Sequence, residues 1–356
     1  GRYGVGAKSD QRGCKRFGIF QHRPGLRACG VGARPSGFVE GDGVDVPGGA
    51  ADDGFGSGAW GGRCGDGAGT VVAVTNQLAV EGQTARRQAG GGRGGVSAVS
   101  RVIAIANQKG GVGKTTTAVN LSACLADLGK RVLLIDIDPQ GNATSGIGID
   151  RRKLKVSIYD VLMDDMPLLD AVVETRVRGL SLLPATIDLA GAEIELVPRL
   201  SRESRLKVAL DPVRDQFDFV LMDCPPSLGL LTINALTAAD SILIPIQCEY
   251  YALEGLTQLM DTFRLVREAL NPRLEVEGVV LTMFDGRTNL SIQVVEDVKR
   301  FFKGQVYRSI ITRNVRLSEA PSHGLPITLY DPRSKGAEAY MELAREVIER
   351  VEERAG

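Results

Sequence analysis

Residues 109–116, with the sequence KGGVGKTT, decide the fold. This glycine loop follows a short apolar run at Arg101–Ala106, which predicts a strand. It precedes Thr116–Leu128, whose apolar residues recur at helical spacing. A glycine loop that joins a strand to a helix is the context that a P-loop requires. Consecutive backbone N–H groups and the helix N-terminus then form an anion nest, and glycine lets the backbone approach phosphates without Cβ clashes.

The loop supplies the groups that a nucleoside triphosphate and its metal need. Lys114 is placed to reach the β- and γ-phosphates, and the Thr115 hydroxyl is placed for Mg²⁺. A glycine-rich turn with a chance Gly-Lys-Thr is the alternative, and the flanking strand and helix weigh against it. The residues expected to hold the nucleotide are Gly110, Gly111, Val112, Gly113, Lys114, Thr115 and Thr116.

The loop departs from the usual P-loop at its start. Gln108 stands where the first glycine should be, and a second lysine, Lys109, lies at the loop entrance. This pattern resembles the deviant Walker A loop of the ParA/MinD ATPases. The resemblance implies that Lys109 reaches across a dimer interface to the partner's ATP. This makes physical sense because two lysines so close together cannot easily both fold onto one phosphate group, and a cation supplied in trans would act like an arginine finger.

Three aspartates follow strand patterns. Asp136 and Asp138 come after a buried run at Arg131–Ile135, and alternation places them on the same side. Asp138 is a candidate to orient the attacking water and Asp136 to lie in the water shell of Mg²⁺; capping of the next segment by one of them is the alternative. Asp223 ends the run Phe217–Met222 like a Walker B acid, and we expect it to hold Mg²⁺ mostly through water.

These assignments complete the predicted site. The predicted catalytic residues are Lys109, Lys114 and Asp138, and the predicted metal-binding residues are Thr115, Asp136 and Asp223.

Strand and helix patterns alternate along residues 101–356. This alternation predicts an α/β fold with a doubly wound, mostly parallel sheet and helices on both faces. Further strands are expected at Ser241–Ile246 and Glu277–Met283. Helices are expected at Ser201–Leu210, Leu228–Ala238, Leu253–Leu270, Ile292–Phe302 and Ser334–Glu353. Ligands of such a sheet bind at the carboxyl ends of its strands.

Glycine distinguishes the first part of the chain from the rest. Of the 44 glycines, 27 fall in residues 1–100, a composition that cannot bury enough apolar surface to offset the entropy of ordering. We expect residues 1–98 to be either a disordered tail or upstream sequence translated from a misplaced start, with the real start near Val96 or Val99. Residues 99–356 are the expected ATPase domain.

Charge and cysteine content narrow the function. Residues 101–356 carry 31 basic and 35 acidic residues, so any nucleic-acid contact must come from a local patch. No stretch approaches 18 apolar residues, so the sequence predicts no membrane-spanning helix. The six cysteines include no C-x-x-C pair, which favours reduced thiols in a cytoplasmic protein over a disulfide frame or a zinc site.

Residues 101–356 resemble the ParA/Soj chromosome-partitioning ATPases along nearly their whole length. The matching stretches are NQKGGVGKTT, LLIDIDPQGNATSG, LMDCPPSLG, FDGRTNLS, NVRLSEAPSHGLPI and YDPRSKGAEAY. The resemblance implies a P-loop ATPase of the deviant Walker A (SIMIBI) type that uses ATP and Mg²⁺ and forms an ATP-sandwich homodimer.

The same resemblance implies partners and a DNA surface. It implies non-specific binding to double-stranded DNA on the nucleoid, and release when a ParB/Spo0J-type protein stimulates hydrolysis. The DNA-contacting arginines of the family fall on Arg287 and Arg316, with Arg313 a near neighbour. An ordinary solvated surface pair is the alternative for these two arginines.

Other functions have weaker support. A MinD-like division-site regulator would end in a basic amphipathic helix for anionic lipid, whereas Glu338–Arg354 carries six Glu against three Arg. We therefore expect no membrane partner. An iron-protein type of cluster carrier would need paired cysteines. A nucleotide-binding scaffold without turnover is disfavoured by Lys109 and Asp138.

Overall fold

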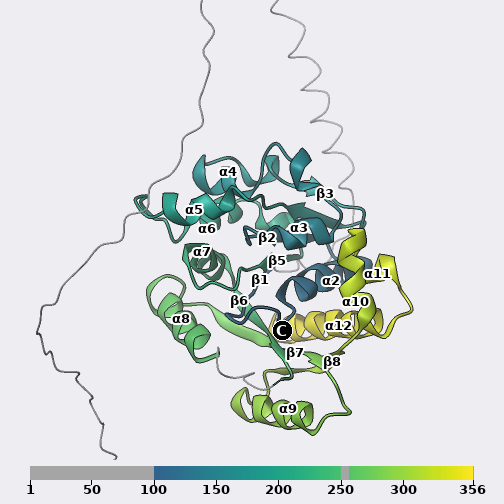
Figure 1. Ribbon diagram of the computed structural model, residues 1–356. Helices are drawn as coiled ribbons and strands as arrows, with labels where there is room; N and C mark the ends of the chain where they lie inside the picture. The colour runs from purple at the N-terminus through teal and green to yellow at the C-terminus, as the bar shows by residue number, and fades with distance from the viewer. Residues whose placement is uncertain (1–99, 250–255, 356) are drawn as a thin grey trace, which may run out of the picture. The chain divides into compact units, whose positions relative to one another are not determined.

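The computed structural model describes residues 100–249 and 256–355. The predicted tail at residues 1–98 lies outside these ranges and stays a prediction. Within them, one eight-stranded sheet has the order β3-β4-β2-β5-β1-β6-β7-β8 (Figure 1). All neighbouring strands are parallel except β3 and β4. The predicted mostly parallel sheet is confirmed. The strands are β1 (Arg101–Ile105), β2 (Val132–Asp136), β3 (Val173–Glu174), β4 (Leu180–Leu183), β5 (Phe219–Asp223), β6 (Ser241–Gln247), β7 (Glu275–Phe284) and β8 (Val306–Thr312).

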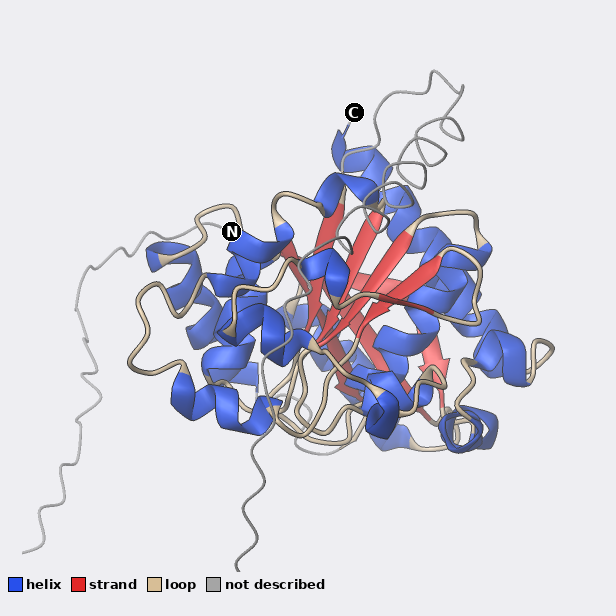
Figure 2. Cartoon of the chain, turned by 90° about the horizontal axis from the view of Figure 1, so that it is seen from above, coloured by secondary structure: helices blue, strands red, loops and turns tan. Residues whose placement is uncertain are grey.

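Helices cover both faces of this sheet (Figure 2). One apolar cluster lies between the sheet and α4 to α9, and a second lies between the sheet and α2, α3 and α10 to α12. The α-helices are α2 (Lys114–Asp127), α3 (Asn142–Gly146), α4 (Ile158–Met163), α5 (Leu189–Glu195), α6 (Arg205–Leu210), α7 (Leu230–Ala238), α8 (Leu256–Ala269), α9 (Asn289–Phe301), α10 (Val315–Glu319), α11 (Ile327–Tyr330) and α12 (Lys335–Ala355). Short 3₁₀ turns are η1 (Arg151–Lys153), η2 (Leu168–Asp170), η3 (Arg214–Gln216) and η4 (Ala320–His323).

Alternation along the central strands decides which face each side chain meets. Leu134 of β2 and Leu221 of β5 belong to the cluster beneath α2. Asp136 and Asp223 come two residues later, so they point to the same face. They are also direct partners in the β2–β5 register. The topology therefore brings two carboxylates together beside the helix that follows the glycine loop.

The predicted elements are correct in type, and their ends differ by a few residues. The largest difference lies at Ser201–Leu210, where the helix is only α6, because Ser201 takes a left-handed backbone angle (φ 51°) and the turn after it continues to Ser204. The sequence patterns missed β8, an edge strand with an exposed Arg308 in its middle. β8 alternates between buried and more exposed residues and so contains no continuous apolar run of the kind that marks a buried parallel strand.

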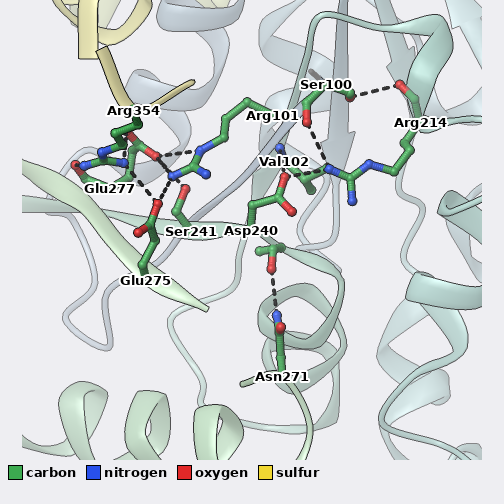
Figure 3. Close-up of polar contacts among 11 residues, drawn as sticks. Ser100, Arg101, Val102, Arg214, Asp240, Ser241, Asn271, Glu275, Glu277 and Arg354 are labelled. Carbon is green, nitrogen blue, oxygen red and sulfur yellow. Dashed lines mark hydrogen bonds and ion pairs between the residues drawn. The ribbon is translucent and has the colours of Figure 1, made fainter. Parts of the chain in front are cut away.

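A buried carboxylate ties β1, β7 and α12 together at the amino-terminal edge of the sheet (Figure 3). Glu277 is fully buried and accepts hydrogen bonds from Arg101 Nε at 2.9 Å, Ser241 Oγ at 2.7 Å and Arg354 Nη1 at 2.9 Å. Glu275 beside it is half exposed and also pairs with both arginines. The buried charge is therefore compensated by two guanidinium groups.

A second carboxylate closes the neighbouring loop in the same view. Asp240 accepts hydrogen bonds from the Val102 N–H at 2.8 Å and from Arg214 Nη2 at 2.7 Å. Arg214 also donates to the Ser100 carbonyl at 2.9 Å. These contacts fix the point at which residue 100 enters the sheet.

Neutralising Glu277 and neutralising Glu275 should change the free energy of unfolding by different amounts. Glu277→Gln should lower the free energy of unfolding by about 2–3 kcal/mol, since it leaves two arginines without their buried partner, although both retain some solvent access. Glu275→Gln, at a side chain 48% exposed, should cost less than about 1 kcal/mol. Urea denaturation followed by far-UV circular dichroism measures both values. Equal losses for the two variants would contradict this account of the network.

Candidate functional site

The glycine loop between β1 and α2 lies at the carboxyl edge of the sheet. Gly111 and Gly113 take left-handed backbone angles, with φ 75° and 88°, which L side chains rarely adopt. Gly113 is the N-cap of α2, and its carbonyl accepts the Thr117 N–H at 2.8 Å. A Cβ on Gly110 or Gly111 would meet no protein atom within 4 Å, so within the protein glycine at 111 is required by its backbone angle. The N–H groups at the start of α2 form the predicted anion nest.

Neighbouring strands hold this loop in place. Thr282 Oγ1 of β7 donates to the Val112 carbonyl at 2.8 Å. Asn107 accepts the Lys109 N–H at 3.0 Å and donates to the Pro245 carbonyl of β6 at 2.7 Å. The conformation of the loop is therefore fixed by hydrogen bonds from Thr282 and Asn107, which lie outside it.

The two lysines of the loop have different environments. Lys114 is buried, and its Nζ donates to the Lys109 carbonyl at 3.2 Å. Burial lowers the pKa of Lys114, and the nearby Asp223 carboxylate opposes this shift. The Lys109 side chain is half-buried and makes no hydrogen bond or ion pair with any residue in the described ranges. One lysine thus closes the loop from inside, and the other carries an uncompensated charge at its entrance.

Asp223 is a fully buried carboxylate without a hydrogen-bond partner within the described part of the chain. Desolvation, followed by repulsion from Asp136, raises its pKa well above the usual value. Thr115 and Lys114 oppose the shift, although neither makes a hydrogen bond of good geometry to it. An unpaired buried carboxylate is costly, so it indicates a ligand that the polypeptide itself does not supply.

Asp136 is equally buried but is held by the protein. The Thr144 N–H and Oγ1 both donate to its Oδ2 at 2.7 Å, and the Asp138 N–H donates to its Oδ1 at 3.2 Å. Desolvation raises the pKa of Asp136 to about 6 in spite of these bonds. Asp136 therefore fixes the loop after β2, and its Oδ1 has the weaker protein contact.

Asp138 lies in the turn that follows β2. Its Oδ1 accepts the Gln140 N–H at 2.9 Å, and its carbonyl accepts the Gly141 N–H at 2.8 Å. Its Oδ2 takes no hydrogen bond from any residue that the structure describes. A carboxylate oxygen is thus held near the loop and left available to a water molecule.

These groups fit a magnesium ion bound together with phosphate. The buried oxygens of Asp223 and the Thr115 hydroxyl are hard donors of the kind that Mg²⁺ prefers. In residues 100–249 and 256–355, no group of three or more His, Cys, Asp or Glu side chains could hold a metal alone. The site therefore suits a cation that takes its remaining ligands from phosphate and water.

A cavity of about 320 Å³ opens beside the loop. The lining includes Gly113, Thr116, Met283, Leu317 and Pro321. Met283 has φ 51°, a strained angle for a methionine, at an irregularity in the β7–β8 pairing. The volume lies at the low end for small-molecule pockets and suits the nucleoside part of a nucleotide.

The predicted DNA-binding arginines lie in segments that follow β7 and β8, at the same edge of the sheet. Arg287, after β7, makes two hydrogen bonds to Asp285 at 2.8 and 2.6 Å, and these lower the pKa of Asp285 to about 2. Arg316, in α10, donates to Glu319 at 3.0 Å. Both arginines are more than half exposed. Each arginine thus pairs with surface carboxylates, and Arg316 has a second one, Asp331, at 3.5 Å.

The sequence patterns missed the residues that support the site. Thr144, Asn107 and Thr282 position Asp136 and the glycine loop, but a lone Thr or Asn in a sequence carries no specific signal. Met283 lies in a strand, as the sequence predicts, but its left-handed backbone angle has no counterpart in the sequence pattern. Only contacts across the sheet identify these residues.

Several known proteins are similar to this chain. A family model described as an AAA domain matches residues 100–276. The chain is 65% identical over 249 residues to the sporulation initiation inhibitor protein Soj of Bacillus subtilis, covering 70% of this chain and 98% of that protein. It is 56% identical over 261 residues to the chromosome partitioning protein ParA of Myxococcus xanthus, covering 73% and 92%.

A solved structure is also similar. Cobyrinic acid a,c-diamide synthase from Mycobacterium smegmatis, with bound ADP and magnesium, is 44% identical with a TM-score of 0.62, and the match covers 69% of this chain and 93% of that one.

Neutralising Asp223 should stabilise the nucleotide-free protein. Its pKa is raised on folding, so its charged form costs stability above that pKa, and Asp223→Asn removes this cost at neutral pH. We expect the Tm to rise by at least about 2 °C, the shift that 1 kcal/mol gives in a domain of this size. In this variant, Mg²⁺ should no longer increase the rise in Tm that ATP binding causes. Differential scanning fluorimetry with ATP, with and without Mg²⁺, measures both effects.

Asp218→Asn is the matched control with the opposite expected sign. Partial burial raises the pKa of Asp218, but hydrogen bonds from Arg131 outweigh this and lower it. Its neutralisation should lower the Tm and leave the Mg²⁺ response intact. A drop in Tm for Asp223→Asn would show that its carboxylate is satisfied in the folded protein.

Proposed function

The chain belongs to the ParA/Soj family of chromosome-partitioning ATPases, and from this premise we propose how it works. It binds ATP with Mg²⁺, pairs with a second copy across the two nucleotides and holds double-stranded DNA without sequence preference. Hydrolysis, stimulated by a ParB-type protein, then releases it from the DNA. Its place in the cell is the cytoplasm, on the nucleoid.

The observation that carries the proposal is the different environment of the two lysines of the loop. Lys114 already lies inside the loop, where a phosphate chain in the nest would meet it. Lys109 has a charge without a partner in the described ranges, at the exposed entrance beside Gly110 and Gly111. A second copy that faces this entrance would present a triphosphate to Lys109. A cation supplied in this way stabilises the charge that develops on phosphoryl transfer.

The carboxylates divide the remaining tasks. Mg²⁺, bound with ATP, supplies positive charge next to the phosphates. Asp223 and Thr115 would hold it, and Asp136, anchored by Thr144, keeps the following loop rigid. Asp138 would accept a proton or a hydrogen bond from the attacking water through its available Oδ2 and so orient it.

The nucleoside would lie in the cavity beside Gly113 and Thr116. The cavity adjoins the first turn of α2, so a phosphate chain in the nest leads directly into it. Leu317 and Pro321 offer apolar contacts to a base, and Asn314 and Ser318 offer polar ones. Because the last four belong to the segment that carries Arg316, nucleotide binding and the DNA surface share one structural unit.

The DNA surface would consist of Arg287 and Arg316 in each copy. Their pairs with Asp285 and Glu319 are exposed, and such pairs are weak, so phosphates can displace the carboxylates. A monomer presents two of these arginines and a twofold-symmetric dimer presents four on one duplex. Dimer formation by ATP would therefore control DNA affinity.

The MinD-like alternative is less well supported. Tyr340, Leu343 and Val347 of α12 are buried against the domain, so this helix does not present an apolar face to lipid. Among the residues that the structure describes, no helix is long and apolar enough to cross a membrane.

Mixing two inactive variants tests the role of Lys109 in trans. Lys109→Ala and Asp138→Ala should each abolish stimulated hydrolysis. In a mixed dimer, the ATP on the Lys109→Ala copy meets an intact Asp138 in cis and an intact Lys109 from the partner. A one-to-one mixture should thus recover about a quarter of wild-type activity, since half of the dimers are mixed and each has one working site.

The assay measures phosphate release in the presence of DNA and the cognate ParB-type protein, with each variant alone as a control. No recovery on mixing would indicate that Lys109 acts on the ATP of its own subunit. Gel filtration with ATP, in which Asp138→Ala should persist as a dimer, verifies that mixed dimers form.

Removing one arginine tests the DNA surface. Arg316→Ala should flatten the dependence of log affinity on log salt by about 2, since each lost phosphate contact removes about 0.9 and the dimer loses two. Binding should weaken equally on duplexes of different sequence, because phosphate contacts carry no sequence information. Fluorescence anisotropy with labelled duplexes and ATP across a potassium chloride series measures this. An unchanged slope would place the DNA surface elsewhere.

A further inference from the structure

A second group of basic residues lies away from Arg287 and Arg316. It belongs to η1, the segment just after it and the turn between β3 and β4. Its members are all exposed: Arg151, Arg152, Lys153, Lys155, Arg176 and Arg178. Their only near acidic neighbours on these segments are Asp150 and Glu174. This local excess of positive charge stands out because residues 101–356 carry a net negative charge.

Three of these arginines meet at one hollow. Arg151, Arg152 and Arg176 line a pocket of about 440 Å³ together with Ser322 and His323 of η4. The pocket also contains Asp150, which pairs with Arg152 at 3.1 Å and lies 3.9 Å from Lys153. Its walls thus come from segments that are far apart in the sequence, and the basic side chains outnumber the carboxylate.

Glycines hold the two walls of the pocket against each other. Gly148, before η1, and Gly324, after η4, have φ of 90° and 61°. A Cβ on Gly148 would lie 2.6 Å from the Gly324 carbonyl oxygen, and a Cβ on Gly324 would lie 2.7 Å from the Gly148 Cα. No larger residue fits at either position without a backbone shift. The two segments that line the pocket are therefore in direct backbone contact at these glycines.

The pocket is continuous with the segment that carries Arg316. The Glu319 side chain pairs with Arg316, and the Glu319 carbonyl accepts the Ser322 Oγ hydrogen bond at 2.6 Å. Ser322 is itself a lining residue. An extended polyanion bound at Arg316 would thus find further positive charge along the same ridge.

We propose that this pocket binds a backbone phosphate of double-stranded DNA, so that the DNA-binding surface extends from Arg316 over η4 to Arg152 and Arg176. The inference rests on the proposed DNA-binding function and adds a site to it. Guanidinium groups are usual partners of phosphate oxygens, and Arg152 and Arg176 supply them here. The Arg152–Asp150 pair does not prevent binding, because Arg152 is 90% exposed and such a pair is weak.

The pocket also touches the loop that carries Asp138. Arg151 donates to the Gln140 carbonyl, and a Cβ on Gly141 would lie 2.6 Å from the Arg151 Cδ. Arg151 is therefore a poor residue to remove, since its loss would disturb the nucleotide site. Among the described residues, the side chains of Arg152 and Arg176 make no hydrogen bond or ion pair to that loop, and Arg152 pairs with Asp150. The Asp150 carboxylate also accepts the backbone N–H of Arg152, and this hydrogen bond remains when the Arg152 side chain is truncated.

The test compares Arg152→Ala/Arg176→Ala with wild type in the ATP-bound state. The probe is a fluorescein-labelled 30-base-pair duplex, and anisotropy is measured between 50 and 200 mM potassium chloride. One phosphate per pocket and two pockets per dimer predict a log–log salt slope flatter by about 1.8. Arg264→Ala/Arg300→Ala is the matched control, because these arginines are exposed and paired with nearby carboxylates in the same way. It should keep the wild-type slope.

A charge-preserving variant separates folding from binding. Arg152→Lys/Arg176→Lys should restore most of the slope, since a phosphate contact needs the charge more than the guanidinium shape. Failure of this variant to restore the slope, while circular dichroism shows a native fold, would overturn the proposal.

The remaining outcomes distinguish the two proposals. If wild type binds the duplex and the double alanine variant has the same slope, the pocket is not a phosphate site and the proposed function stands. If wild type does not bind DNA with ATP, both fail. Loss of sedimentation with phosphatidylglycerol vesicles in the double variant, with unchanged DNA binding, would assign the pocket to lipid and overturn the inference.

Discussion

The constraint on which the site depends is the pairing of two buried carboxylates across neighbouring parallel strands. Asp136 and Asp223 are register partners at the ends of β2 and β5, fully buried and of like charge. Strand spacing keeps their backbones about 5 Å apart, so they cannot separate. Desolvation raises the pKa of both carboxyl groups; repulsion from Asp136 raises that of Asp223 further, and Asp138 adds to the rise of Asp136. The fold thus holds two buried carboxyl groups side by side near the glycine loop. A divalent cation bound with phosphate would compensate their negative charge.

A buried carboxylate is paired at one edge of the sheet, and another is left without a partner among the described residues at the other edge. At the amino-terminal edge, Glu277 is surrounded by donors and two arginines, so it stabilises the junction of β1, β7 and α12. At the carboxyl edge, Asp223 has no donor among the described residues and Lys109 has no acceptor there. The network around Glu277 supports the fold, and the groups without partners at the carboxyl edge are the ones that the proposed function assigns to ligands. Such a division is expected where function requires charges that the polypeptide must not neutralise itself.

The sequence predicted the sheet, the glycine loop and the order of the three aspartates because each depends on local pattern. Alternation in β2 and β5 is enough to point Asp136 and Asp223 to one face. Alternation does not predict that Thr144 donates hydrogen bonds to Asp136 while Asp223 has no partner among the described residues. That difference arises because the loop after β2 folds back onto Asp136. The strain at Met283 likewise follows from an irregular β7–β8 pairing, and the sequence of one strand does not contain it.

The surface arginines illustrate a further limit of pattern reasoning. Arg287, Arg316 and Arg152 each face a carboxylate within two or three residues, so their local sequences look neutral. Neutral pairs of this kind suit reversible binding. A polyanion must displace each carboxylate, which keeps a single contact weak, and the many phosphates of a duplex allow several contacts to form together. Affinity then rises steeply with the number of arginines presented on one face. Under the proposed function, in which the dimer separates to release DNA, this steepness is useful because halving the number of contacts removes far more than half of the binding constant.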